Sequence, residues 1–147
     1  MPYKNIEIGS IKTAQTKVAV KQSQFYKGFS TQNPDGASTK LFDFELIKQD
    51  IINHFRTRKG ERVMNPTFGS IIWDLLMEPL TDEVRDALQK DVTEICNFDL
   101  RVAPLQIDLT EYDNGYILEL TLLLKGTDQS TNLKLQFDQK VGLSVLE

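Results

Sequence analysis

The stretch of residues 56–69 concentrates the charged side chains whose chemistry is easiest to interpret. It contains three arginines, one lysine, one glutamate, two glycines and one proline. Guanidinium groups pair well with carboxylates and phosphates. Gly60 and Gly69 can adopt backbone conformations that strain other residues, and Pro66 fixes its own φ. We therefore expect a shaped connection that presents guanidinium groups at set positions. The plainer alternative is a helix–helix connection whose charges are simply solvated.

Three residues of this stretch, Arg58, Glu61 and Arg62, are the first predicted partner-binding residues. Their close spacing predicts fixed pairing, either within the chain or across to a partner. Glu61 could instead be drawn with Glu78 as a pair of glycosidase carboxylates. In a chain with 21 acidic residues, however, such a pair can always be drawn. We interpret Glu61 as an ion-pair partner of Arg58 or Arg62.

Motifs of the common enzyme classes are missing from the sequence. It has no phosphate loop, dinucleotide fingerprint, metal-spaced His/Cys cluster or serine nucleophile elbow. The one histidine, His54, lies beside an apolar helical pattern and far along the chain from the one cysteine, Cys96. We interpret His54 as a packing or rim residue, and we expect no enzymatic activity, no cofactor and no metal.

Length and composition predict one ordinary globular domain. The chain has 147 residues, of which 40% are hydrophobic and 26% charged. No apolar run approaches the roughly 20 residues of a membrane span, and the N-terminus lacks the apolar core of a signal peptide. A single cysteine excludes an internal disulfide and fits a reducing compartment. The net charge of −4 argues against a general nucleic-acid binder.

Charge divides the chain into an arm and a body. Residues 1–40 hold six of the 17 basic residues and two of the 21 acidic ones, which leaves 11 basic and 19 acidic residues in 41–147. A basic arm before an acidic body predicts an interaction segment, although the arm could also fold back onto its own body. We place the boundary near Lys40. Alternation at residues 17–21 permits one short strand in the arm, and residues 32–36 form a turn signal.

Three helices are expected in the first part of the body. Asp43 is the predicted cap of the first, which carries apolar residues at helical spacing from Phe44 to Phe55. Ser70 is the predicted cap of a short second helix, from which Trp73 is expected to face a second surface or a partner. Thr81 caps the third, whose apolar positions recur at spacings of four, four and three residues: Val84, Leu88, Val92 and Ile95.

The pattern then changes from helical to strand-like. Leu105, Ile107 and Leu109 alternate with polar residues, and Asn114-Gly115 is a preferred two-residue hairpin turn. That turn sets three predicted cross-strand pairs: Leu109 with Leu120, Ile107 with Leu122, and Leu105 with Leu124. Further strands are expected at residues 133–137 and in the alternating tail, 141–145. The fold class predicted is α+β, with three helices packed on a small antiparallel sheet that includes a C-terminal β-hairpin.

A resemblance adds what spacing cannot supply. Residues 57–62 (Thr-Arg-Lys-Gly-Glu-Arg), residues 66–69 (Pro-Thr-Phe-Gly) and the apolar helix leading to Pro79 resemble the baseplate wedge subunit of contractile-tailed bacteriophages. The same family includes the baseplate component of type VI secretion systems that starts sheath assembly. The similarity covers residues 41–138 in element order. Residues 28–31 (Gly-Phe-Ser-Thr) also resemble the opening segment of longer phage members.

One motif departs from the family pattern. Members typically carry Glu-Pro-Arg between the last helix and the first hairpin strand, where this chain has Asp99-Leu100-Arg101. The resemblance associates that motif with docking onto the helical core bundle of the wedge. It therefore implies that Asp99 and Arg101 bind a partner. An intramolecular cap and ion pair at the helix–strand junction is an equal alternative.

The resemblance implies a structural protein of the virion tail baseplate, assembled in the host cytoplasm and present in several copies. Its expected partners are other wedge proteins and the tail sheath protein, with no nucleic acid and no membrane. Leu143, in the tail, is the last predicted partner-binding residue, because an open sheet edge can accept an added strand of the sheath. The alternative is that the tail only closes its own sheet.

Two other functions stay open at this point. Family members have been labelled lysozyme-like, so the runner-up is a peptidoglycan-cleaving hydrolase. The third is an intracellular adaptor unrelated to phage.

Overall fold

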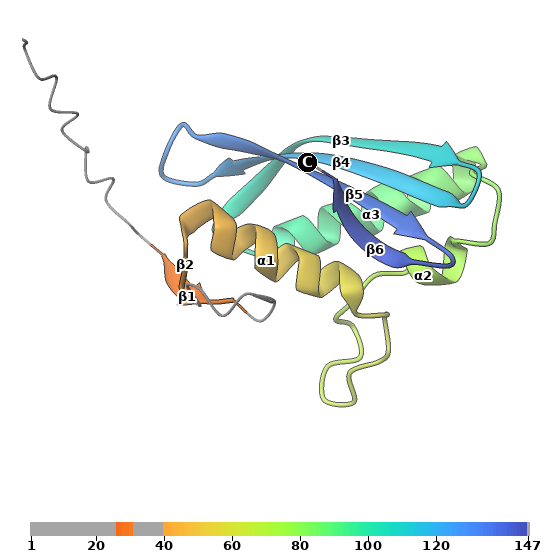
Figure 1. The fold of residues 1–147 in the computed structure, drawn as a ribbon, viewed down its shortest axis with the longest axis horizontal. Coiled ribbons are helices and arrows are strands. Elements are labelled where there is room, and N and C mark those ends of the chain that lie inside the picture. The colour runs from red at the N-terminus through yellow and green to blue at the C-terminus, as the bar shows by residue number, and fades with distance from the viewer. Residues whose placement is uncertain (1–25, 31–39, 147) are drawn as a thin grey trace, which may run out of the picture.

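The fold is a four-stranded antiparallel sheet with helices against one face. The computed structural model describes residues 26–30 and 40–146. Its elements are β1 (Lys27–Phe29), β2 (Lys40–Phe42), α1 (Asp43–Arg56), α2 (Ile72–Leu75), α3 (Asp82–Phe98), β3 (Val102–Tyr112), β4 (Gly115–Leu124), β5 (Ser130–Asp138) and β6 (Gly142–Leu146). The large sheet has the order β3-β4-β5-β6, and α1 and α3 lie on the same side of it (Figure 1). Three helices packed on an antiparallel sheet were predicted, whereas the second sheet, β1-β2, was not.

The core lies between the two long helices and the inner face of the sheet. Each apolar position repeated along α1 and α3 packs there, including Ile47, Phe55, Leu88 and Val92, which are at most 1% exposed. The opposite sheet face is polar, with an exposed Glu119–Lys134 ion pair between β4 and β5. One apolar and one polar face are what the strict alternation of these strands requires. None of the helices among the described residues is long and apolar enough to cross a membrane.

The start of α1 differs from the prediction. Asp43 does not cap the helix, since its carboxylate accepts a hydrogen bond from the backbone N–H of Tyr26 at 2.9 Å. Its own N–H donates to the Tyr26 carbonyl, and its φ is 45°. Asp43 thus joins the helix to the β1-β2 hairpin, so this described part of the arm folds against the body. The strand and turn expected at residues 17–21 and 32–36 lie outside the described residues.

The β3-β4 hairpin is present, but its register is shifted by two residues. The loop consists of Asp113 and Asn114, so that Leu109 pairs with Leu118 and Ile107 with Leu120. Gly115 belongs to β4, where a Cβ would lie 1.9 Å from the Phe137 carbonyl oxygen. This close approach of β5 explains why glycine stands there. A shift of two residues keeps the same side chains on the inner face.

The predicted pair of Leu105 with Leu124 is wrong. The register changes between Pro104 and Gln106, and Leu124 pairs with Val102 instead. Leu105 is the extra residue of this bulge, and its side chain is 59% exposed. A bulge reverses the side to which the following residues point, which is why Val102 is buried and Leu105 is not.

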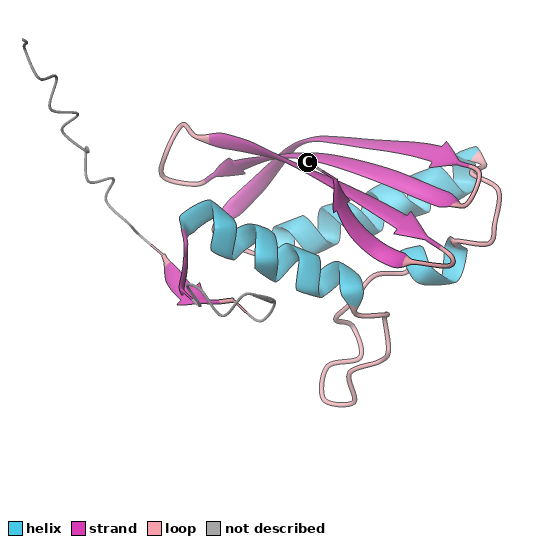
Figure 2. Cartoon of the chain, in the orientation of Figure 1, coloured by secondary structure: helices cyan, strands magenta, loops and turns pink. Residues whose placement is uncertain are grey.

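The chain between α1 and α2 projects away from the body as a long loop (Figure 2). Trp73, in α2, is half-buried: it packs against the core and also lines a hollow at the surface. Its indole N–H donates to the Phe55 carbonyl at 2.6 Å, and its ring packs edge-to-face on Phe137. Trp73 therefore fastens α2 to α1 and to the sheet.

Candidate functional site

The projecting loop, residues 57–71, has a defined backbone structure. Arg58 and Ser70 form a parallel bridge at its base, and the Gly60 N–H donates to the Pro66 carbonyl at 2.8 Å nearer the tip. Gly60 and Gly69 have φ values of 88° and 117°, as their types predicted. A Cβ at Gly69 would lie 2.6 Å from the Arg58 backbone. These contacts give the loop a defined backbone conformation, which confirms the predicted shaped connection between the helices.

A buried carboxylate on α3 holds the base of this loop. Asp91 is 3% exposed, and its Oδ2 accepts hydrogen bonds from the Ser70 hydroxyl at 2.7 Å and from the Ile71 N–H at 3.1 Å. Its Oδ1 lies 3.3 Å from Nζ of Lys59. The Ser70 hydroxyl in turn accepts from the Ile72 N–H at the start of α2, as its predicted capping role required. Asp91 therefore joins the loop, α2 and α3.

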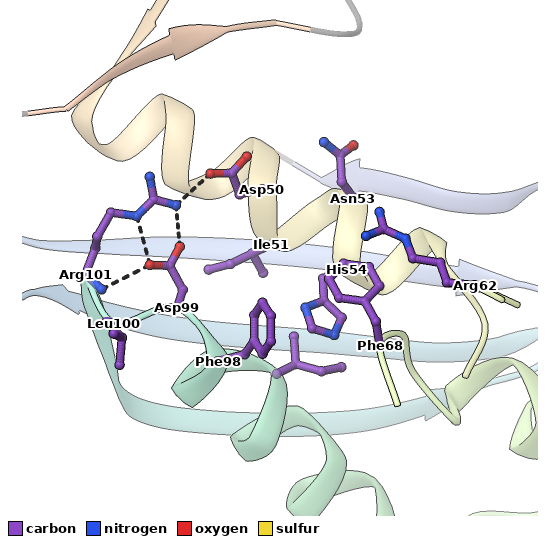
Figure 3. Close-up of a pocket in the computed structure, with 11 residues that line it drawn as sticks. Asp50, Ile51, Asn53, His54, Arg62, Phe68, Phe98, Asp99, Leu100 and Arg101 are labelled. Carbon is purple, nitrogen blue, oxygen red and sulfur yellow. Dashed lines mark hydrogen bonds and ion pairs between the residues drawn. The ribbon is translucent and has the colours of Figure 1, made fainter. Parts of the chain in front are cut away.

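Three side chains stack where the loop meets the helices. The Phe68 ring lies 3.8 Å from the His54 ring and nearly parallel to it, and the Arg62 guanidinium lies over Phe68 at 3.7 Å. Phe98 closes the cluster edge-to-face against both rings. Figure 3 shows Phe68 between His54 and Arg62. His54 is 7% exposed, which confirms that it packs.

The junction between α3 and β3 carries a strong ion pair within the chain. Nε of Arg101 donates to Oδ1 of Asp99 at 2.8 Å, and Nη2 of Arg101 donates both to Oδ2 of Asp99 at 2.5 Å and to Oδ2 of Asp50 at 2.6 Å. The Arg101 N–H also donates to Asp99. The intramolecular alternative is therefore realised in this structure. Leu100, between the two charges, is 81% exposed.

These two clusters line one groove of about 540 Å³. Arg62 and Phe68 stand at one end, and Asp99, Leu100 and Arg101 stand at the other (Figure 3). Between them lie Ile51 and Asn53 from α1, with Ile95 and Phe98 from α3. Phe98 is 63% exposed although it is a large apolar residue. A concave apolar surface with charge fixed at both ends is typical of a binding site.

The charge states of the groove follow from its contacts. Burial raises the pKa of Asp99, but the hydrogen bonds and charge of Arg101 outweigh burial and leave the pKa below its usual value. The Asp99 hydrogen bond likewise holds the pKa of Arg101 above its usual value. Burial lowers the pKa of His54; Asp91 opposes this, while Arg62 and Lys59 add to it. The groove thus carries a closed ion-pair network at one end and an arginine on an aromatic ring at the other.

Sequence reasoning found some of these residues and missed others. Arg62, Asp99 and Arg101 meet at the groove, although they lie up to 39 positions apart. The predicted ion pairing of Glu61 takes a different form, because its carboxylate accepts from the backbone N–H of Arg58 at 2.9 Å. The Arg58 side chain lines a separate hollow. Asp91 was missed, yet its place at i+3 from Leu88 within the apolar pattern of α3 was a signal of burial.

Leu143, the remaining predicted site residue, lies on β6 and does not line the groove. It pairs with Phe137 of β5 and packs partly against the core. The tail therefore forms the last strand of the sheet, and β6 is one of its two outer strands. Val145, on the same strand, is 45% exposed.

Comparisons of the sequence and of the fold with known proteins agree on one family. The family model described as baseplate wedge protein gp25 matches residues 43–132. The baseplate wedge protein gp25 of Enterobacteria phage T4 is 26% identical over 94 residues, which is 61% of this chain and 71% of that protein. A crystal structure from Geobacter sulfurreducens, named as a tail lysozyme, shares the fold with a TM-score of 0.54 and 20% identity, over 70% of this chain and 90% of that one. Since the family model spans more than half of the sequence, the chain belongs to the baseplate wedge protein gp25 family.

Proposed function

We propose that this protein is a structural subunit of the baseplate wedge of a contractile phage tail, which docks on the helical core bundle of the wedge and templates the first ring of tail sheath. Family membership supports the coarser statement, a structural role in the phage baseplate with other baseplate components as partners. The observation that carries the docking proposal is the groove, which has Arg62 at one end, Asp99 and Arg101 at the other, and exposed apolar residues beside them.

The docking surface suits an amphipathic helix. Phe98 and Leu100 are exposed and apolar, and an apolar helix face would bury both. Asp99 and Arg101 satisfy each other, so their role is to hold Leu100 outward at the end of a rigid turn. Arg62 has its guanidinium on the Phe68 ring and offers its donors to a carboxylate of the docked helix.

The test of docking is co-purification with co-expressed core-bundle subunits. We expect Leu100→Asp to lose the bundle, because it places a charge in the apolar contact. Leu105→Asp is the matched control, since Leu105 is also exposed but lies on β3 outside the groove. Arg62→Ala should weaken binding, with the exposed Arg56→Ala as its control. Undiminished binding by Leu100→Asp, with unchanged thermal unfolding, would contradict docking at this groove.

Sheath templating is proposed for the outer edge of β6. An outer strand presents backbone N–H and C=O groups that an added strand can pair with. Such pairing draws affinity from main-chain hydrogen bonds, and side-chain pockets set the specificity. A sheath subunit that adds a strand here would start the polymer from one template.

Two neighbouring proline substitutions test templating. In an antiparallel strand, successive residues direct their N–H groups alternately to the partner strand and away from it. One of Leu143→Pro and Ser144→Pro therefore removes a donor to β5, and the other removes a donor at the open edge. Thermal unfolding identifies the variant that lost its open-edge donor, because that variant is destabilised less than the one that lost its donor to β5. We expect that variant to form baseplates on which sheath does not polymerise.

Leu135→Pro, in the inner strand β5, is the control for damage to the fold. Normal sheath growth on baseplates carrying the open-edge proline variant, and on those truncated after Gln139, would remove β6 from the mechanism.

A further inference from the structure

A second hollow, of about 360 Å³, lies between α2 and the turn that joins β5 to β6. The amide of Gln139 in this turn donates to the Leu76 carbonyl at 2.9 Å, so the turn is fixed against α2. Figure 1 shows the same turn beside α2. β6 begins at Gly142, directly after residues of this hollow. The hollow therefore lies at the end of the sheet where the outer strand β6 begins.

Part of its wall is apolar and preorganised. Met77 and Val141 line it and are 77% and 79% exposed. Trp73 forms the inner wall and is held by its hydrogen bond to Phe55 and its packing on Phe137. A fixed indole beside two exposed aliphatic side chains can bury an apolar side chain without rearranging the core.

Its rim carries an excess of positive charge. Arg58 and Lys140 both line the hollow, together with Asp138. The Asp138 carboxylate is already engaged, because Oδ1 accepts from the N–H groups of Lys140 and Val141 and Oδ2 accepts from the Tyr112 hydroxyl. Within residues 26–30 and 40–146, no ion pair joins the side chain of Arg58 or Lys140 to a carboxylate. Two cations around one engaged acid stand out in a chain of net charge −4.

We propose that this hollow receives the end of the strand that adds to β6, with an apolar side chain against Trp73 and a neighbouring carboxylate between Arg58 and Lys140. The inference rests on the proposed strand pairing at β6. Main-chain pairing accepts almost any sequence, whereas this hollow selects an acidic residue next to an apolar one. The partner segment is thus an extended peptide with an acidic–apolar end, and Arg58 is a specificity-determining residue.

The experiment measures binding of the purified tail sheath subunit to the purified wedge subunit at low and high salt. Charge complementarity predicts that Arg58→Glu and Lys140→Glu each weaken binding by about tenfold at low salt and reduce its salt dependence. Lys90→Glu makes the same charge change on the exposed face of α3, away from the hollow, and should leave binding unchanged. Met77→Ser and Val141→Ser should weaken binding at both salt concentrations.

Met64→Ser and Val63→Ser are the matched controls for the apolar contacts, because these residues are 96% and 92% exposed at the tip of the loop. If the open-edge proline variant abolishes binding while the Arg58, Lys140, Met77 and Val141 variants match their controls, the hollow is not part of the interface and strand pairing stands. If the open-edge proline variant binds normally, strand pairing and this inference both fail.

Discussion

The carboxylate of Asp91 accepts a hydrogen bond from the hydroxyl of Ser70 at 2.7 Å, across 21 positions of the sequence. Both residues are buried, at 3% and 0% exposure. Through this contact a residue in the middle of α3 fixes the end of the loop that carries Arg62 and Phe68. The shape of the groove therefore depends on a side chain that does not line it.

The first prediction is that Asp91→Ala destabilises the protein and loosens the loop. It leaves the Ser70 hydroxyl and the Ile71 N–H buried without an acceptor, which costs about 1–3 kcal/mol for each such group. Chemical denaturation measures the loss, and proteolysis at the loop measures the loosening. Glu94→Ala is the control, since the exposed Glu94 carboxylate also contacts Lys59, with 3.7 Å between Oε2 and Nζ. Equal stability of the two variants would show that Asp91 does not hold the loop.

The second prediction concerns pH and His54. Because its pKa is lowered in the folded state, the unfolded chain takes up a proton first as pH falls through about 6.5. Stability should therefore fall between about pH 7.5 and 5.5, before most carboxylates titrate. His54→Phe keeps an aromatic ring against Phe68 and removes the titration, so its stability should stay flat over this range. A slope retained by His54→Phe would assign the effect to another group.

The third prediction concerns the Asp99–Arg101 pair. The pKa of Asp99 is lowered in the folded state, so the pair stabilises the fold above the unfolded value of about 3.9 and loses this contribution as pH falls further. Asp99→Asn should cost about 1–3 kcal/mol at pH 7, with the difference from wild type shrinking below about pH 4. Arg101→Lys keeps the positive charge but loses the planar guanidinium that pairs with a carboxylate through two hydrogen bonds. It should therefore retain only part of the stability that the pair contributes. A difference that is independent of pH would contradict this account.

The fourth prediction is that Cys96 is inert in the native protein. Its side chain is fully buried, and burial raises the pKa of the thiol to about 12. Since the thiolate is the reactive form, a thiol reagent should modify Cys96 only at the rate of unfolding. Mass spectrometry across a denaturant series measures this. Rapid labelling in buffer would show that the core opens locally around α3.

The fifth prediction is that the purified protein does not cleave cell-wall peptidoglycan. If the protein were a hydrolase, Glu61 would be the candidate catalytic carboxylate. In the structure this carboxylate accepts a hydrogen bond from the Arg58 N–H in the exposed loop. A turnover assay on purified peptidoglycan, run beside Glu61→Gln, distinguishes the two functions. Cleavage that disappears in a folded Glu61→Gln variant would establish the hydrolase instead.

Periodicity predicted the elements well because burial of one face is a local property of a helix or strand. The apolar positions of α1 and α3 are buried as expected, and the cap of α3 is the Thr81 hydroxyl, which accepts from the Val84 N–H. Turn chemistry was a weaker guide. Asn114-Gly115 is a preferred turn, yet the close approach of β5 to Gly115 moved the loop by one residue. The bulge at Leu105 left no local signal that alternation alone could detect.

The groove was predictable only in part. The spacing of charges singled out Arg62, and the family resemblance singled out Asp99 and Arg101. Neither could show that the three residues line one surface, because that depends on how α1 packs beside α3. Asp50 and Phe98 were missed since each looks like an ordinary helical residue until the Arg101 side chain and the Phe68 ring are placed next to it.

The bulge in β3 makes the two outer strands of the sheet unequal. At this strand Pro104 has no N–H to donate and Leu105 interrupts the ladder, so a neighbouring strand would find a broken row of partners. β6 has no such interruption in its pairing with β5. The two edges of the sheet therefore differ: an added strand can pair along β6 without interruption, but not along β3. Under the proposed templating, we therefore expect strands to add at β6 and not at β3, so that sheath assembly starts from this subunit in one direction only.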